Sequence, residues 1–148
     1  MNHRGTENTE ISDRLEELNQ LTRKIIGAAM EVHKQLGPGY LESVYKEALA
    51  HEFDIRKIPY QRQPEFGINF KGKKVGLNQL DFLVDKKVVV ELKAVDALLP
   101  IHKATVISFL KATDVRLGLL INFNVIVLKE GIKRLVRGNP SELSNTQL

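Results

Sequence analysis

Three residues near the middle of the chain have the types and the spacing needed for metal-assisted hydrolysis. Asp81 stands ten residues before Glu91, and Lys93 follows Glu91 at the end of the apolar run "VVVELK". Carboxylates beside a buried strand cost free energy unless they are paired with a cation or bind a metal. A hard divalent cation such as Mg²⁺ prefers carboxylate oxygens, and a neighbouring lysine can orient water or stabilise charge developing on a phosphate. The set therefore indicates metal-dependent phosphodiester hydrolysis.

The hairpin that contains these residues determines whether they meet. Side chains alternate along a strand, so Glu91 and Lys93 share one face. A three-residue loop over 85–87 pairs Asp81 with Glu91, at about 5 Å between Cβ atoms, whereas a two-residue loop pairs Asp81 with Leu92. The sequence leaves both registers open. It also leaves open a surface patch in which Lys93 neutralises the acids. If the acids form a metal site, we expect removal of either one to relieve repulsion in the metal-free protein.

Helical periodicity predicts the elements that surround this hairpin. Apolar residues recur at helical spacing from Leu15 to Leu36, which indicates one long helix or two abutting helices ending at Gly37-Pro38-Gly39. A second amphipathic helix is expected from about Leu41 to Asp54. A third is expected over 102–112, after Pro100.

Period-two segments rich in β-branched and aromatic residues predict the strands. Breaks at Pro64, Gly72 and Gly76 indicate an antiparallel meander. The expected strands lie near 60–70, 74–84 and 88–93, with a fully buried strand over 116–123 and a last edge strand or short helix over 131–137. This order of elements indicates an α+β or three-layer (α/β/α-like) sheet protein.

Chain length and composition limit the domain organisation. The 148 residues suffice for one hydrophobic core. We expect a single domain over residues 11–137, with mobile polar tails over 1–10 and 138–148. The absence of cysteine excludes thiolate metal sites and favours the cytoplasm, and no apolar run is long enough for a membrane span.

The charge balance suits a polyanionic partner. Lysine and arginine number 22 against 18 acidic residues, a net charge of +4. We expect nucleic-acid contacts from basic loops, although solvated loops would show the same charges. The lysines in question are Lys71, Lys73, Lys74, Lys86 and Lys87.

Linked motifs resemble a known nuclease group. Asp81 followed by "ELK" (91–93) resembles the PD-(D/E)xK nuclease superfamily, and "GYLESVY" (39–45) is similar to the signature of GxxExxY proteins, with Gly39, Glu42 and Tyr45 in place. The resemblance covers about residues 21–137. It implies a restriction-endonuclease-like core, a mixed sheet with an antiparallel hairpin flanked by helices.

The resemblance also implies the roles of particular residues. Asp81, Glu91 and the Leu92 carbonyl would bind Mg²⁺ or Mn²⁺, with Lys93 as the catalytic lysine. Glu42 alone would be a helix-dipole residue, but the family match makes it a third acidic ligand and catalytic group. Two further residues are expected to support the site rather than bind the metal. His33 lies on the apolar face of the first helix, where a histidine is more often a hydrogen-bonded core residue than a ligand, and its place before "LGPG" equally suits bracing the loop that presents Glu42. Tyr45 is expected to pack, with its hydroxyl near the site.

One departure from the family pattern bears on activity. Thr105 and Phe109 stand where related nucleases carry a glutamine and a tyrosine on the helix after the ExK strand. The acidic set and the lysine still predict a Mg²⁺- or Mn²⁺-dependent nuclease acting on nucleic acid, and the resemblance to the family implies DNA rather than RNA as the substrate. The alternative is a non-catalytic nucleic-acid-binding or assembly module that retains the nuclease fold. The oligomeric state stays open, a homodimer included.

Overall fold

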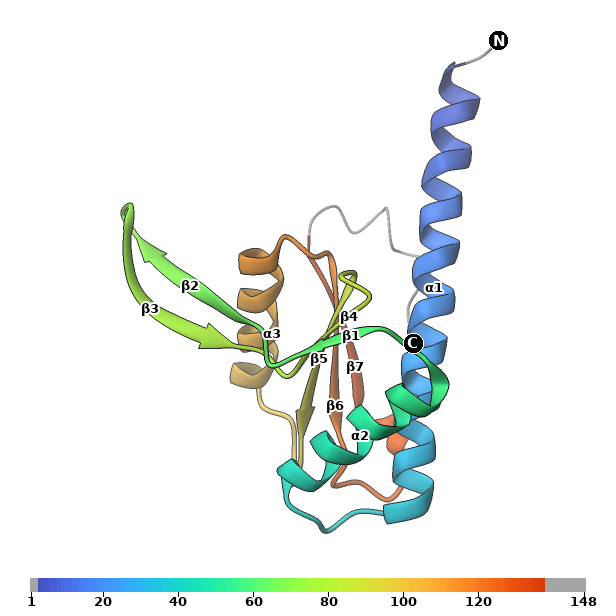
Figure 1. Ribbon diagram of the computed structural model, residues 1–148, viewed down its shortest axis with the longest axis vertical. Coiled ribbons are helices and arrows are strands. Elements are labelled where there is room, and N and C mark those ends of the chain that lie inside the picture. Colours follow the sequence, from blue (N-terminus) through green and yellow to red (C-terminus); the bar gives the residue numbers. More distant parts are fainter. Residues whose placement is uncertain (1–2, 138–148) are drawn as a thin grey trace.

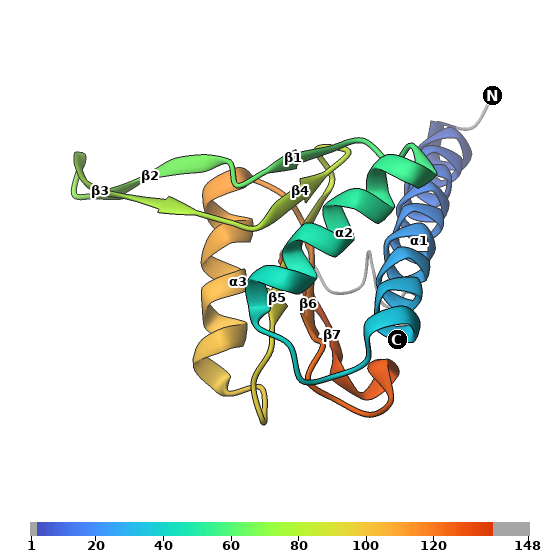
Figure 2. The same ribbon diagram turned by 60° about the horizontal axis from the view of Figure 1, so that its bottom comes forward.

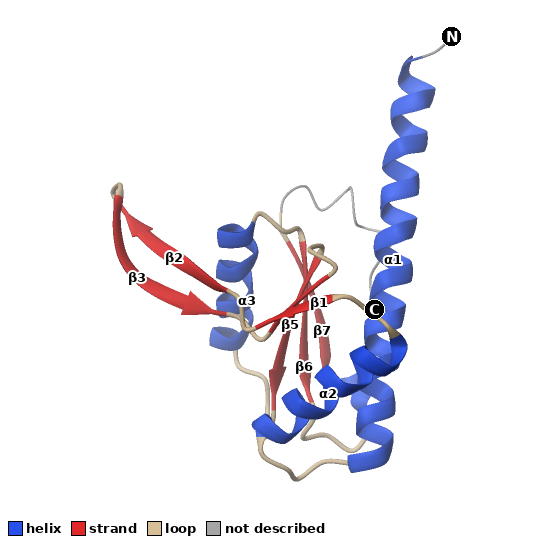
Figure 3. Cartoon of the chain, in the orientation of Figure 1, coloured by secondary structure: helices blue, strands red, loops and turns tan. Residues whose placement is uncertain are grey.

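A mixed sheet of five strands is the centre of the computed structural model, which describes residues 3–137 (Figures 1 and 3). Its strand order is β1-β4-β5-β6-β7, and β2 and β3 form a separate two-stranded sheet. β5 and β6 run parallel, whereas the other pairs are antiparallel. The strands are β1 (Tyr60–Arg62), β2 (Glu65–Phe70), β3 (Lys73–Gln79), β4 (Phe82–Val84), β5 (Val88–Lys93), β6 (Leu117–Asn122) and β7 (Ile132–Val136).

Helices cover the two faces of the five-stranded sheet. α1 (His3–Leu36) and α2 (Glu42–Arg56) lie on one face, and α3 (Pro100–Thr113) lies on the other (Figure 2). α3 is the crossover that the parallel pair β5–β6 requires. A short 3-10 helix, η1 (Leu128–Gly131), precedes β7. The fold is therefore of the expected α+β class, with β4–β5 as its antiparallel hairpin.

Each face of the sheet has its own hydrophobic core. The core under α1 and α2 is the larger, and the core under α3 includes residues from the opposite side of β5 and β6. Large members of the first core are Ile25, Tyr45, Leu49, Phe53, Phe82, Leu92, Leu117 and Phe123. The second core contains Leu80, Val89, Val106, Phe109, Leu110, Val115 and Leu120.

The central strands are apolar because both of their faces are covered. Every residue of β6 is buried, and so is every residue of β5 except Lys93. Gly118 allows α3 to pack closely, since a Cβ there would lie 2.7 Å from Val106 Cγ1. Continuous burial is typical of parallel strands between helical layers. A charged residue in this part of β5 therefore needs partners within the protein.

The first helix is longer than expected. α1 is one uninterrupted helix that begins at His3, so residues 3–10, expected to belong to a tail, are helical. Ile11, Leu15 and Leu18 continue the apolar stripe of the helix at i, i+4 and i+7. Residues 1–2 and the expected tail from Gly138 lie outside the described residues.

The expected meander is divided into two sheets. The strands expected over 60–70 and 74–84 are interrupted at Gln63-Pro64 and at Leu80-Asp81, so β1 pairs with β4 while β2 pairs with β3. Proline cannot donate a ladder hydrogen bond, which explains the first break. The β2–β3 hairpin projects beyond α3 (Figures 1 and 2). The Phe66 ring packs edge-on against Phe109, at 5.4 Å between ring centroids.

Candidate active site

The turn between β4 and β5 sets the register of the acidic residues. Val84 pairs with Val88 and Phe82 with Val90, which leaves a three-residue turn over 85–87. Continued by one position, this register places Asp81 opposite Glu91. Of the two registers left open by the sequence, the structure adopts the one that brings the acids together.

Asp81 and Glu91 are buried and hydrogen-bonded through the backbone. Their exposed fractions are 8% and 7%. The backbone N–H of Asp81 donates to Glu91 Oε1 at 2.5 Å, and the N–H of Leu92 donates to Asp81 Oδ2 at 2.8 Å. Each carboxylate is thus held by the strand that carries the other, which fixes the orientation of both groups.

A lysine on α2 joins the third acid to this pair. Lys46 Nζ lies 2.9 Å from Glu42 Oε2 and 2.9 Å from Asp81 Oδ1. Glu42 therefore lies on the side of α2 that faces Asp81, with the Lys46 ammonium between the two carboxylates. We call Glu42, Asp81 and Glu91 the acidic cluster. The sequence interpretation missed Lys46, although its i, i+4 spacing from Glu42 indicates one helix face.

The pKa values of Glu91 and of the neighbouring Lys46 are both raised, for different reasons. Burial, together with the negative charge of Asp81, raises the pKa of Glu91 to about 8. The hydrogen bond from the Asp81 N–H and the positive charges of Lys93 and Lys46 act to lower this pKa, but they are outweighed. Burial alone would lower the pKa of Lys46, but hydrogen bonds and charge attraction to Glu42 and Asp81 raise it instead. Lys46 is therefore a permanent cation at neutral pH.

The chemistry of these side chains suits a hard divalent cation. Carboxylate oxygens are the ligands that Mg²⁺ prefers, and the Lys46 ammonium already stands between two of the carboxylates as a cation. As the side chains stand, no three His, Cys, Asp or Glu residues within 3–137 converge closely enough to hold a metal ion. The residues therefore have the oxygen donors that a divalent metal requires. To bind it together, they need the Lys46 ammonium to move away.

Lys93 and Leu92 lie at the end of β5 beside the cluster. Lys93 shares the α3 face with Glu91, because side chains alternate along the strand. The N–H of Phe123 donates to the Lys93 carbonyl at 2.9 Å. Leu92 is wholly buried, and its N–H is used by Asp81. The alternation therefore places Lys93 on the same side of β5 as the Glu91 side chain.

Asn122 supports the chain just after Lys93, and it was not singled out from the sequence. It pairs with Lys93 across β5 and β6 and is 2% exposed. Its Oδ1 accepts from Val95 N at 3.0 Å, and its Nδ2 donates to Val95 O at 2.8 Å. The sequence signal that could have found it is a single polar residue, Asn122, at the end of the otherwise apolar run "LGLLIN".

Tyr45 braces the loop that leads to Glu42. Its hydroxyl donates to Gly37 O at 2.6 Å and accepts from Tyr40 N at 3.2 Å. Its ring stacks on Phe123 at 4.7 Å. Gly37 and Gly39 have φ values of 70° and 109°, which favour glycine. Tyr45 thus packs in the core and fixes the start of α2.

His33 braces a different loop from the one expected. Its Nε2 is 2.7 Å from the carbonyl of Val125, in the segment between β6 and η1. The ring also lies against Phe123, at 6.4 Å between centroids. The interaction ties α1 to the chain after β6. His33 therefore supports the same end of the sheet without contacting Glu42.

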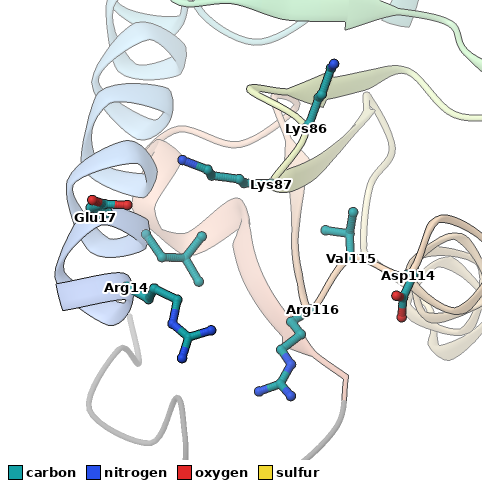
Figure 4. A pocket seen from close by; sticks show the side chains of 8 residues that line it. Arg14, Glu17, Lys86, Lys87, Asp114, Val115 and Arg116 are labelled. Carbon is teal, nitrogen blue, oxygen red and sulfur yellow. The ribbon is translucent and has the colours of Figure 1, made fainter. Parts of the chain in front are cut away.

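The basic residues expected to contact nucleic acid fall into two groups. Lys71, Lys73 and Lys74 lie at the tip of the β2–β3 hairpin. Lys86 and Lys87 occupy the β4–β5 turn, at the opposite end of β5 from Lys93. There they line a pocket of about 260 Å³ together with Arg14, Glu17, Leu18, Asp114, Val115 and Arg116 (Figure 4).

The departure on α3 has a structural explanation. Phe109 is 2% exposed and belongs to the second core, where it packs against Phe66. The Thr105 hydroxyl donates to the carbonyl of Ile101 at 2.9 Å, within its own helix. Phe109 therefore serves packing, and Thr105 satisfies its hydroxyl locally.

The comparison with protein families agrees with this geometry. A model of the PD-(D/E)XK nuclease superfamily matches residues 19–135. This is well over half of the sequence, and the chain belongs to the PD-(D/E)XK nuclease superfamily. Neither the search of curated proteins nor the search of solved structures returned a match.

Membership supports a nuclease-type function on nucleic acid, and proteins of this superfamily generally use divalent metal ions. Within residues 3–137, no helix is long and apolar enough to cross a membrane.

Proposed function

We propose that this protein is a metal-dependent nuclease that hydrolyses phosphodiester bonds in DNA. One observation carries the proposal: Asp81 and Glu91 are held opposite each other on adjacent strands, and Glu42 approaches Asp81 from α2. The convergence of acids from separate elements on a buried strand end is costly unless a cation neutralises them, and in the metal-free protein the Lys46 ammonium stands between two of the three. Membership of a nuclease superfamily supports the same function.

Different residues of the chain would bind the metal, stabilise the developing charge and contact the phosphates. Glu42, Asp81, Glu91 and the Leu92 carbonyl would hold Mg²⁺ or Mn²⁺, which when bound supplies Lewis acidity and lowers the pKa of a bound water. Lys93, on the same face as Glu91, stabilises negative charge that develops on the attacked phosphate. Lys71, Lys73, Lys74, Lys86 and Lys87 contact phosphates without reading bases.

Several finer points accompany this proposal. Gly39, Glu42 and Tyr45 support placement in the GxxExxY group, and the absence of cysteine supports action in the cytoplasm. Residues 11–137 would act as one nuclease domain.

The experiment that tests the function is cleavage of defined nucleic acids by purified protein. Single-stranded, double-stranded and branched DNA, and the matching RNAs, are incubated with Mg²⁺, with Mn²⁺ or with a chelator. We expect metal-dependent cleavage of DNA that Lys93→Ala removes. Metal-independent cleavage, or equal cleavage by the Lys93→Ala protein, would contradict the proposal.

A non-catalytic nucleic-acid-binding module is the second candidate. The observation in its favour concerns the two positions where related nucleases carry glutamine and tyrosine. Phe109 is buried and has no polar group, and the Thr105 hydroxyl donates its hydrogen bond within its own helix. This module would bind DNA without cleaving it under any of these conditions.

A further inference from the structure

We propose that Lys46 is a displaceable internal cation that competes with the divalent metal for the acidic cluster and so limits the metal affinity of the site. The inference rests on the proposed function, because it concerns the same cluster. It adds a residue that neither the nuclease motif nor the family match assigns.

The position of the Lys46 ammonium is the first argument. Its Nζ bridges Glu42 Oε2 and Asp81 Oδ1 at 2.9 Å each. The other oxygen of Asp81 accepts the Leu92 N–H. Oδ1 is therefore the Asp81 oxygen that faces a cation, and the ammonium already holds it. A metal ion bound by Glu42 and Asp81 together would need the same space.

The charge of Lys46 is the second argument. A protonated lysine has three N–H donors and no lone pair, so it cannot itself bind a metal. Beside a divalent ion its positive charge is repelled. Lys46 and the metal are thus alternatives for the same carboxylates rather than partners.

The contrast in rigidity is the third argument. Asp81 and Glu91 are held by backbone N–H groups of the sheet. Lys46 is held by side-chain ion pairs alone among the contacts described, its side chain is 22% exposed, and its stem has four flexible carbons. The acids can therefore stay in place while the ammonium swings toward solvent.

The competing explanation is that Lys46 forms a purely structural ion pair between α2 and the sheet. The two explanations differ in whether the stabilisation by Lys46 depends on bound metal. A structural tie would stabilise the fold equally with and without metal. A competing cation stabilises only the metal-free protein, because the metal takes over its role when bound.

The test measures Mn²⁺ affinity by calorimetry and thermal unfolding, with and without Mn²⁺, on the full chain. Lys46→Met removes the charge and keeps an unbranched stem. Lys46→Arg keeps the charge. Lys24→Met is the control for net charge, since Lys24 is exposed on α1 and borders a pocket with Lys57, Ile58 and Asp85, beside the β4–β5 turn.

We expect Lys46→Met to bind Mn²⁺ about tenfold more tightly than the parent, the scale of one to two released ion pairs. Its melting temperature should fall without metal and equal or exceed that of the parent at saturating Mn²⁺. Lys24→Met and Lys46→Arg should bind no more tightly than the parent. Equal or weaker binding by Lys46→Met, or the same loss of melting temperature with and without Mn²⁺, would overturn the inference.

A measurement on the unmodified protein covers the case in which Lys46→Met does not fold. Acetylation of each lysine is followed by mass spectrometry with and without Mn²⁺. Lys46 should become more reactive when Mn²⁺ binds, whereas Lys24 should not change. An unchanged or more protected Lys46 would count against displacement.

These outcomes are separate from those of the function itself. A parent that binds Mn²⁺ but cleaves no nucleic acid would contradict nuclease activity, and the affinity ratio would still decide the role of Lys46. Absence of Mn²⁺ binding in both parent and Lys46→Met would overturn the inference and the metal requirement together.

Discussion

The two ends of the β4–β5 hairpin carry similar charged residues in opposite environments. At the open end, Asp81 and Glu91 are buried and held by backbone N–H groups. At the turn, Lys87 lies 3.7 Å from Asp85, and their side chains are 51% and 45% exposed. Charges interact strongly where water is excluded and weakly where it is present. Burial, rather than residue type, therefore distinguishes the candidate site from a solvated turn.

The largest expected effect of this contrast is on catalysis. Lys93→Ala should reduce the cleavage rate by about 10³-fold or more, because it removes a group that acts on charge present mainly in the transition state. Lys87→Ala should leave the rate at saturating DNA nearly unchanged. Single-turnover cleavage measures both, and binding of Mn²⁺ to Lys93→Ala should match the parent. A similar loss of rate in the two variants would remove the distinction between the two ends.

The next effect is a dependence of stability on pH that originates at Glu91. Its pKa is raised to about 8 in the folded protein, from an ordinary value of 4.5, so the fold favours the neutral carboxyl. The stabilisation is complete below pH 4.5 and is lost as the pH rises through 8. By linkage the loss is on the order of a few kcal/mol. Urea unfolding without metal, from pH 5 to 8.5, measures it.

Glu91→Gln should flatten this pH profile, whereas Glu17→Gln, on the exposed side of α1, should leave it as in the parent. Added Mn²⁺ should reverse the trend, because the metal requires the ionised carboxylate. A Glu91→Gln profile as steep as that of the parent would place the titrating group elsewhere.

A smaller effect is expected on the stability of the metal-free fold when Asp81 is changed. Asp81→Asn weakens the ion pair to Lys46 and should cost about 1–3 kcal/mol. From the sequence we expected that loss of either acid relieves repulsion. Because Asp81 is paired with Lys46, we now expect this relief for Glu91 but not for Asp81. Asp85→Asn is the matched change at the turn. Asparagine tolerates the left-handed backbone of Asp85, with φ 50°, so this variant should stay within about 0.5 kcal/mol of the parent.

The smallest effect concerns phosphate contacts at the turn. Lys87→Ala should weaken DNA binding a few-fold for all sequences and reduce the slope of log affinity against log salt by about one. Its melting temperature should not change. Fluorescence anisotropy over a series of salt concentrations measures the slope, with Lys111→Ala on α3 as the control. An unaltered slope would exclude Lys87 from the DNA contacts.

Much of this protein follows from local sequence signals. The period of "VVVELK" predicts a strand with Glu91 and Lys93 on one face, and Gly37-Pro38-Gly39 predicts the end of α1. The strand over 88–93 and the end of α1 at Leu36 are both confirmed, because they depend on backbone preferences and burial within a few residues. The α+β class follows from the order of such segments.

The register of the hairpin and the neighbours of the acids were decided only by tertiary structure. Two loop lengths were compatible with the sequence, and packing of Phe82 and Val84 into the core under α2 selects the one that places Asp81 opposite Glu91. Lys46 reaches Asp81 because α2 crosses this end of the sheet. No local pattern encodes that contact, since it joins residues 35 positions apart through the packing of a helix over the end of a strand.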